Sequence, residues 1–115
     1  MKTYNFPELV RGDTFEAFPF KFNINGTDVD FSDPDNTAKV QFRLGGQKGK
    51  VYHEATIGDG LTANDPAVGW IKINEFQTAT WPAGVYYYDV ELNLNGKVKT
   101  YIGGTISKVI QDTTN

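Results

Sequence analysis

Residues 82–96 decide the fold class, and they read Pro-Ala-Gly-Val-Tyr-Tyr-Tyr-Asp-Val-Glu-Leu-Asn-Leu-Asn-Gly. Every second side chain from Tyr86 to Leu94 is apolar and most of those between are polar, which is typical of a strand with one buried and one solvated face. The run ends in Asn95-Gly96, a preferred pair for a type I′ hairpin turn, because both central residues of that turn need a positive φ. The stretch therefore predicts a long strand that turns directly back into an antiparallel partner.

The same two signals recur along the chain. Residues 18–24 and 38–44 alternate in the same way, and Asn25-Gly26 follows the first of these runs. Shorter candidate strands are Val51–Ile57, Gly69–Ile73, Val98–Ile102 and Thr105–Ile110. Seven or eight short strands, with turns every ~8–12 residues, predict a single all-β domain over residues 1–115, an antiparallel β-sandwich.

Two details concern the edges of the expected sheets. Pro19 interrupts the first alternating run, which predicts an edge strand or a bulge because proline has no N–H to donate to a neighbouring strand. Gly103-Gly104 separates the last two candidate strands, which predicts a second bulge or a place where the chain changes sheets. No segment keeps an apolar stripe of helical period long enough to predict a helix.

The composition excludes several functional classes. The 115 residues contain no cysteine, so thiol catalysis, disulfide bonds and zinc–thiolate sites are excluded. The net charge is −3, so neither nucleic acid nor an anionic membrane is an expected partner. No apolar run approaches the ~18 residues of a membrane span, and residues 1–8 lack the apolar core of a secretory signal. We therefore expect a protein that is made and kept in the cytoplasm, or assembled there into something larger.

The candidate chemical residues are few, and each has a structural interpretation. His53 is the only histidine, and without a Gly-x-Ser-x-Gly motif it predicts no catalytic triad. Asp28, Asp30, Asp33 and Asp35 are spaced somewhat like a calcium loop but lack its glycine and its final glutamate. Asp28 and Asp30 are therefore expected to face solvent on a short strand, and residues 33–36 are expected to build a turn. Gly45–Lys50 lacks the spacing of a phosphate loop and predicts a hairpin tip. The sequence therefore predicts no enzyme, no cofactor and no metal site.

Three aromatic residues support an alternative function. Trp70, Trp81 and Tyr87 would form a stacking platform for sugar rings if all three were exposed on one surface. Trp70 and Tyr87 both lie on the polar side of their alternating runs, which favours exposure. The alternative is therefore a soluble carbohydrate-binding β-sandwich module.

Residues 84–88 read Gly-Val-Tyr-Tyr-Tyr, which resembles the Gly-x-Tyr-x-Cys start of strand F in immunoglobulin domains. The resemblance implies an immunoglobulin-like sandwich in which Tyr86 is the structural tyrosine corner. Its hydroxyl would form a hydrogen bond to the backbone upstream. Tyr88 stands at the position of the family's second cysteine, so an aromatic core would have to replace the disulfide. A glycine turn followed by an ordinary tyrosine-rich strand explains the same residues.

A wider resemblance is carried by six segments in order along the chain, namely Phe6–Phe15, Ala38–Arg43, Gly58–Leu61, Gly69–Ile71, Pro82–Val90 and Lys99–Ile106. In these core and turn residues the chain resembles the immunoglobulin-like N-terminal domain of tailed-phage baseplate upper proteins, and related phage tail and head-decoration domains. Baseplate upper proteins usually continue past this domain into a helical and receptor-facing region. A free-standing copy of the domain fits a small virion decoration protein, a tail adaptor and a fibre-attachment protein about equally well.

The resemblance implies a non-enzymatic virion structural protein of the tail, baseplate or head. Its expected partners are other virion proteins, with adhesion to a host-surface glycan as a further expected role. Its expected location is the virion, and a homo-oligomer is compatible with it. Strand edges and exposed loops would supply the contact surfaces.

Overall fold

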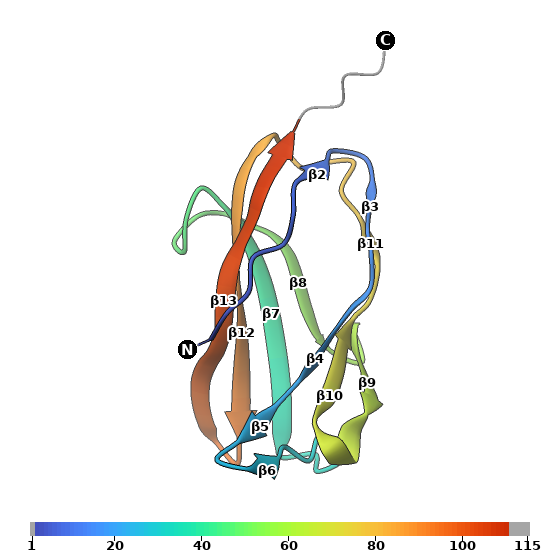
Figure 1. The fold of residues 1–115 in the computed structure, drawn as a ribbon, viewed down its shortest axis with the longest axis vertical. Coiled ribbons are helices and arrows are strands. Elements are labelled where there is room, and N and C mark those ends of the chain that lie inside the picture. Colours follow the sequence, from blue (N-terminus) through green and yellow to red (C-terminus); the bar gives the residue numbers. More distant parts are fainter. Residues whose placement is uncertain (1, 111–115) are drawn as a thin grey trace.

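The computed structural model describes residues 2–110, with side chains for residues 3–106, and these form an all-β fold elongated along its longest strands (Figure 1). The strands are β1 (Lys2–Thr3), β2 (Leu9–Val10), β3 (Thr14–Phe15), β4 (Phe18–Lys21), β5 (Asn23–Ile24), β6 (Thr27–Asp28), β7 (Asn36–Leu44), β8 (Val51–Ile57), β9 (Gly60–Asp65), β10 (Trp70–Ile73), β11 (Phe76–Gln77), β12 (Gly84–Leu94) and β13 (Lys97–Ile110). The one helical element in residues 2–110 is the 3-10 turn η1 (Pro66–Val68). Over the described residues no helix is long and apolar enough to cross a membrane. The predicted all-β class is confirmed.

One strongly curled sheet makes up most of the fold. Seven strands lie in it in the order β13-β12-β7-β8-β9-β10-β4, and β1 and β2 add to the far side of β13 as short parallel strands. Two small pairs, β3 with β11 and β5 with β6, lie outside it. Most neighbours are antiparallel, but β8 and β9 are parallel, so the sheet is mixed. It forms a half-barrel with an opening between β4 and the β13 edge (Figure 1).

This half-barrel corrects the predicted antiparallel sandwich, because the strands do not separate into two clear sheets. A period of two assigns each side chain to a face, but it does not assign a partner to each strand. Between β8 and β9, Gly58 and Gly60 have positive φ values of 90° and 96°, and after this turn β9 runs parallel to β8 in the same sheet. The strands on both sides of this turn therefore belong to one continuous sheet.

Both Asn-Gly turns form where the sequence predicts them. Asn95 and Gly96 join β12 to β13 with φ values of 54° and 87°, and Asn25 and Gly26 join β5 to β6 with 53° and 83°. In each turn the side chain of an asparagine two residues before the pair accepts a hydrogen bond from the glycine N–H, at 2.9 Å and 3.1 Å respectively. The two hairpins are therefore determined locally.

β4 is an edge strand, as Pro19 predicts. The Phe22 N–H donates to the Gly69 carbonyl at 2.8 Å, and the same register places Phe20 opposite Ile71. In an antiparallel pair hydrogen-bonded positions alternate with non-bonded ones, so Pro19 directs its nitrogen away from β10 to the open side. The proline therefore removes no hydrogen bond from the sheet, and it discourages pairing by a further strand.

β13 runs unbroken through Gly103 and Gly104, so the predicted bulge or change of sheet at this pair is wrong. The register between β12 and β13 shifts instead between Val90 and Glu91 and, near the start of β12, between Gly84 and Tyr86. A Cβ added at Gly104 would lie 2.0 Å from the carbonyl oxygen of Tyr4. Glycine is needed at position 104 because the N-terminal segment passes close to β13.

An aromatic core fills the half-barrel. Phe42, Trp81 and Tyr86 are at most 2% exposed. Trp81 stacks on Tyr86 with ring centroids 4.4 Å apart, and its ring lies 5.8 Å from that of Phe42. Tyr88 stacks on the other side of this group, 5.6 Å from Phe42. Because such aromatic pairs contribute about 0.5–1.5 kcal/mol each beyond area burial, they stabilise a core that contains no disulfide.

Candidate functional site

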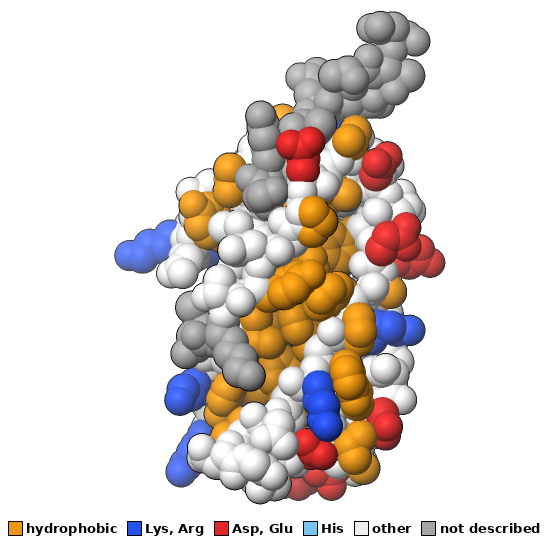
Figure 2. All heavy atoms as spheres, viewed as in Figure 1, with side chains coloured by type: hydrophobic (Ala, Val, Ile, Leu, Met, Phe, Trp, Pro, Cys, Tyr) orange, Lys and Arg blue, Asp and Glu red, His pale blue; other side chains and the backbone are white. Residues whose placement is uncertain are grey.

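An apolar cavity of about 300 Å³ opens where the curled sheet does not close on itself. One wall is the N-terminal segment Tyr4–Leu9, which runs beside β13, and the other is the segment Thr14–Phe18, which leads into β4. We call this opening the seam. Figure 2 shows it as a strip of hydrophobic side chains along the middle of the face.

Aromatic rings cross the floor of the seam. The ring centroid of Phe6 lies 5.0 Å from that of Phe18 and 5.1 Å from that of Phe15. Tyr4, which is 40% exposed, lies 4.9 Å from Phe18. The two walls therefore contact each other through aromatic side chains while the cavity stays open to solvent.

Hydrogen bonds hold the N-terminal wall in place. The hydroxyl of Tyr88 donates to the carbonyl of Tyr4 at 2.6 Å. The N–H groups of Tyr4 and Phe6 donate to the β13 carbonyls of Gly103 and Thr105, at 3.2 Å and 2.8 Å. Burial, and secondarily the nearby Tyr4, raise the pKa of Tyr88 well above its usual range. Tyr88 therefore stays protonated as the donor around neutral pH.

The seam was not predicted from the sequence as a site. Its phenylalanines lie in short or alternating apolar runs, and such runs indicate a core. The available signal was a pair of prolines, Pro7 in the N-terminal wall and Pro19 on the open side of β4. Prolines of this kind mark strand edges that remain unpaired.

Tyr86 is fully buried, and its hydroxyl donates to the carbonyl of Pro82, four residues upstream, at 2.6 Å. A tyrosine corner makes this kind of contact. Burial, and then the nearby Tyr52, raise the pKa of Tyr86 to about 12. The hydrogen bond fixes the turn that leads into β12, which pairs with β7 on one side and β13 on the other.

We expect Tyr86→Phe to lower the free energy of unfolding by about 1–3 kcal/mol, because the Pro82 carbonyl loses its buried donor. Tyr87→Phe is the matched control. Tyr87 is half-buried and its hydroxyl has no hydrogen bond to the described residues, so a change within about 0.5 kcal/mol is expected. Urea unfolding of both variants measures the difference. Equal effects of the two substitutions would show that the Tyr86 hydroxyl contributes nothing particular.

The three aromatic residues of the expected sugar platform do not lie together, and this expectation is corrected. Trp81 is 2% exposed and belongs to the core. Trp70 on β10 and Tyr87 on β12 are half-buried, with β7, β8 and β9 between their strands. Trp81 precedes β12 in a turn in which its N–H donates to the Thr78 carbonyl at 3.0 Å. Because it lies outside any alternating run, the sequence pattern did not assign it to a face.

His53 lies half-buried on β8 with its ring stacked on Phe76, the ring centroids 3.7 Å apart. Its Nε2 atom is buried and has no hydrogen-bond partner among the described residues. Burial lowers the pKa of His53 below its usual 6.5, and the carboxylate of Asp59 partly opposes this. The folded protein therefore favours the neutral imidazole, which suits a ring that is packed against Phe76.

The stability of the protein should fall as the pH drops below about 6.5. Because folding lowers the pKa of His53, the unfolded chain binds the proton more tightly, and protonation favours unfolding. This loss of stability is absent above the pKa that His53 has in the unfolded chain, and it is complete below the pKa that His53 has in the folded protein. We expect the urea midpoint to fall between pH 7.5 and pH 5.5 in the native protein and to change less in His53→Phe. An equal fall in the variant would assign the pH dependence to other groups.

Asp28 lies on the short strand β6, where its Oδ1 accepts a hydrogen bond from the Asn23 side-chain amide, whereas Asp30 and Asp33 build turns. The Oδ1 of Asp30 accepts a hydrogen bond from the Ser32 N–H, and the Oδ1 of Asp33 accepts one from the Asp35 N–H, both at 2.9 Å. Within the described part of the chain, no three His, Asp or Glu side chains are grouped to hold a metal ion. The carboxylates of Asp30 and Asp33 therefore act on the backbone of their own loop.

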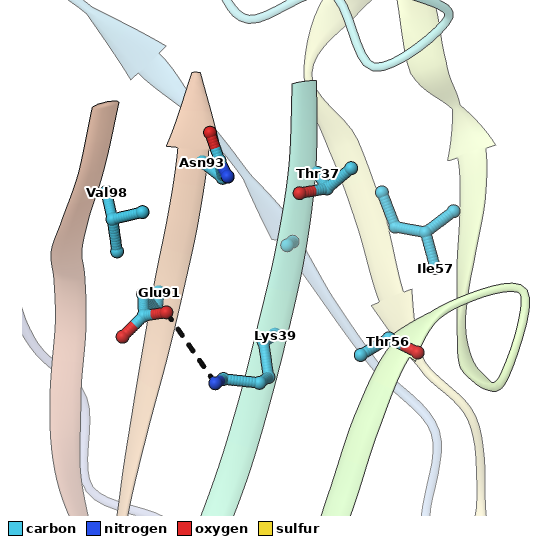
Figure 3. Close-up of a pocket in the computed structure, with 8 residues that line it drawn as sticks. Thr37, Lys39, Thr56, Ile57, Glu91, Asn93 and Val98 are labelled. Carbon is cyan, nitrogen blue, oxygen red and sulfur yellow. Dashed lines mark ion pairs between the residues drawn. The ribbon is translucent and has the colours of Figure 1, made fainter. Parts of the chain in front are cut away.

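A second, open depression lies on the outer face of the sheet, across β7, β8, β12 and β13 (Figure 3). Lys39 and Glu91 form an ion pair in it with a nitrogen–oxygen distance of 3.7 Å, and Val98 beside them is 58% exposed. An exposed ion pair contributes roughly 0–1 kcal/mol. The remaining polar groups include the hydroxyls of Thr37 and Thr56, so this depression suits weak polar contacts.

Comparisons of this chain with protein-family models, with curated proteins and with solved structures found no match. Function is therefore inferred from the seam, from the unpaired strand edges and from the resemblance in the sequence.

Proposed function

We propose that this protein is a non-enzymatic structural component of a tailed-phage virion, in the tail, baseplate or head decoration, and that it works through protein–protein contacts. The seam is the observation that carries the proposal. A contiguous apolar strip on the surface of a small domain marks an interaction surface, because a partner that covers the strip removes apolar area from water. The resemblance to phage baseplate and decoration domains supplies the virion as the place of assembly.

We also propose that the domain is a distorted relative of the immunoglobulin-like fold. The hydrogen bond from Tyr86 to Pro82 supports this, because it lies at the start of a long strand as a tyrosine corner does. Tyr88 supports it too, since its stacking on Phe42 fills the position where the family has a cysteine. The parallel pairing of β8 with β9 departs from the family pattern and accounts for the curled, continuous sheet.

The carbohydrate-binding alternative is not favoured. A sugar platform needs neighbouring aromatic faces that are open to solvent, and Trp81 is in the core. Trp70 and Tyr87 lie on strands that are separated by three others. Adhesion to a host-surface glycan would require a different surface of the molecule.

Mass spectrometry of purified particles, combined with antibody-labelled electron microscopy, tests the proposed function. We expect the chain in the particles at a fixed copy number, with the label at one defined position on the tail or the head. A chain that is produced during infection but is absent from the particles would contradict the virion role.

A further inference from the structure

Two carboxylates stand at the rim of the otherwise apolar seam. Glu8 and Glu16 are exposed and lie on opposite walls of the cavity. Among the described residues that line this cavity there is no lysine or arginine, and neither glutamate forms an ion pair within the described part of the chain. A complementary partner is therefore apolar at its centre and positively charged on both sides.

The cavity is large enough for one bulky side chain. A dry cavity of ~150 Å³ holds a benzene molecule, and the seam offers about 300 Å³. Its floor presents the rings of Phe6, Phe15 and Phe18, with centroid spacings of about 5 Å between neighbours. An inserted aromatic ring would find partners here at the 4.5–7 Å separations that aromatic pairs prefer.

The walls of the seam do not favour the addition of a main-chain strand. Pro7 in the N-terminal wall has no N–H, and Pro19 directs its nitrogen to the open side of β4. A strand laid along the N-terminal wall, or along β4 where it continues the other wall, would find a donor missing from the ladder. The favourable contact is therefore the insertion of a side chain into the cavity, with charged neighbours on the rim.

A second copy of this chain does not offer such a segment on its described surface. Its exposed large apolar side chains are those of Tyr4, Val68, Val85 and Val98. Only Val98 stands between two lysines, Lys97 and Lys99. Successive side chains of a strand point to opposite faces, so these lysines do not flank the Val98 side chain.

We infer that the seam binds a segment of a different protein that carries one aromatic or large aliphatic side chain between lysine or arginine residues. The apolar side chain inserts against Phe6, Phe15 and Phe18, and the cations face Glu8 and Glu16. This inference rests on the proposed function, since it names the partner chemistry for its contact surface.

Fluorescence anisotropy with the purified protein and three labelled peptides tests the inference. The first peptide is Lys-Lys-Thr-Trp-Thr-Lys-Lys, the second replaces every lysine by glutamate, and the third replaces tryptophan by alanine. We expect the first to bind and each of the other two to bind at least about tenfold more weakly. The peptides have the same length, so the comparison separates charge from the apolar anchor.

Two substitutions in the seam, each with a matched control, locate the binding. Ala17→Trp fills the cavity from an exposed position and should abolish binding, whereas Ala67→Trp in the exposed turn η1 should change it less than twofold. Glu16→Lys should weaken binding about three- to tenfold. Asp65→Lys makes the same charge change at an exposed position whose side chain caps nothing, and it should have little effect.

Three results would overturn the inference: no binding of the basic peptide, equal binding of the acidic peptide, or unchanged binding in both Ala17→Trp and Glu16→Lys. Self-association in analytical ultracentrifugation that Ala17→Trp abolishes would also overturn it, because the occupant would then be a second copy. The assay needs no particles. Peptide binding by a protein that is absent from particles contradicts the proposed function alone, and a virion protein that binds no basic peptide contradicts this inference alone.

Discussion

Trp81→Ala is expected to lower the free energy of unfolding by about 3–5 kcal/mol. The Trp81 side chain is 2% exposed and stacks on Tyr86, and its ring lies 5.6 Å from that of Phe76. Alanine would leave a cavity that its neighbours cannot fill, because Phe42 and Tyr86 are held in the paired strands β7 and β12. Domains of this size have a total stability of about 5–15 kcal/mol, so the variant should lose a large part of it.

Trp70→Ala is the matched control, because Trp70 is half-buried at the outer side of β10. A loss below about 1 kcal/mol is expected for it. Guanidinium unfolding, followed by circular dichroism, measures both variants without relying on tryptophan emission. Equal losses would contradict the position of Trp81 in the core, and they would restore it as a candidate for surface contact.

Gly104→Ala is expected to lower the free energy of unfolding by roughly 3 kcal/mol and to open the seam. The new Cβ would lie 2.0 Å from the Tyr4 carbonyl oxygen and 2.9 Å from the Asn5 Oδ1, so the N-terminal wall must move. That movement breaks two hydrogen bonds, one from the Tyr88 hydroxyl to the Tyr4 carbonyl and one from the Thr105 N–H to the Asn5 Oδ1. The variant should therefore bind more of an apolar dye such as anilinonaphthalene sulfonate.

Gly96→Ala separates crowding from backbone strain. A Cβ at Gly96 meets nothing within 4 Å, but its φ of 87° disfavours alanine, so a loss of about 1 kcal/mol is expected. Dye binding by this variant should stay at the native level, because Gly96 lies in the β12–β13 turn. A Gly104→Ala protein that is as stable as the native one would mean that the N-terminal wall does not lie close to β13.

Features with a local cause were predictable from the sequence. The strand predicted over Val51–Ile57 has the same bounds as β8. The Asn95-Gly96 turn forms because asparagine and glycine adopt the two positive φ values of this turn readily. Pro19 marked an edge strand because a missing N–H has the same consequence in any sheet. These predictions need only the residues themselves and their nearest neighbours.

Features that depend on distant residues were not predictable. The all-β class was predicted, but the curled half-barrel in place of a clear sandwich was not, because strand pairing at β8–β9 decides whether the sheet continues, and alternation does not encode pairing. Gly103-Gly104 was interpreted as a break, whereas Gly104 is needed by the approach of Tyr4, 100 residues away in the sequence. The seam exists only because the two edges of the curled sheet do not meet. It therefore depends on two segments that are distant in sequence, and the pattern of neither segment predicts it.

The central claim is that the seam is covered by another protein in the particle, and the absence of cysteine from this chain allows a direct measurement. Single cysteines are introduced as Ala17→Cys in the seam and Ala67→Cys in η1, both exposed positions, and their rates of maleimide labelling are compared in the free protein and in purified particles. We predict that Ala17→Cys reacts readily in the free protein and is protected in particles, while Ala67→Cys keeps its rate. Particles in which Ala17→Cys reacts as fast as in the free protein would contradict the account.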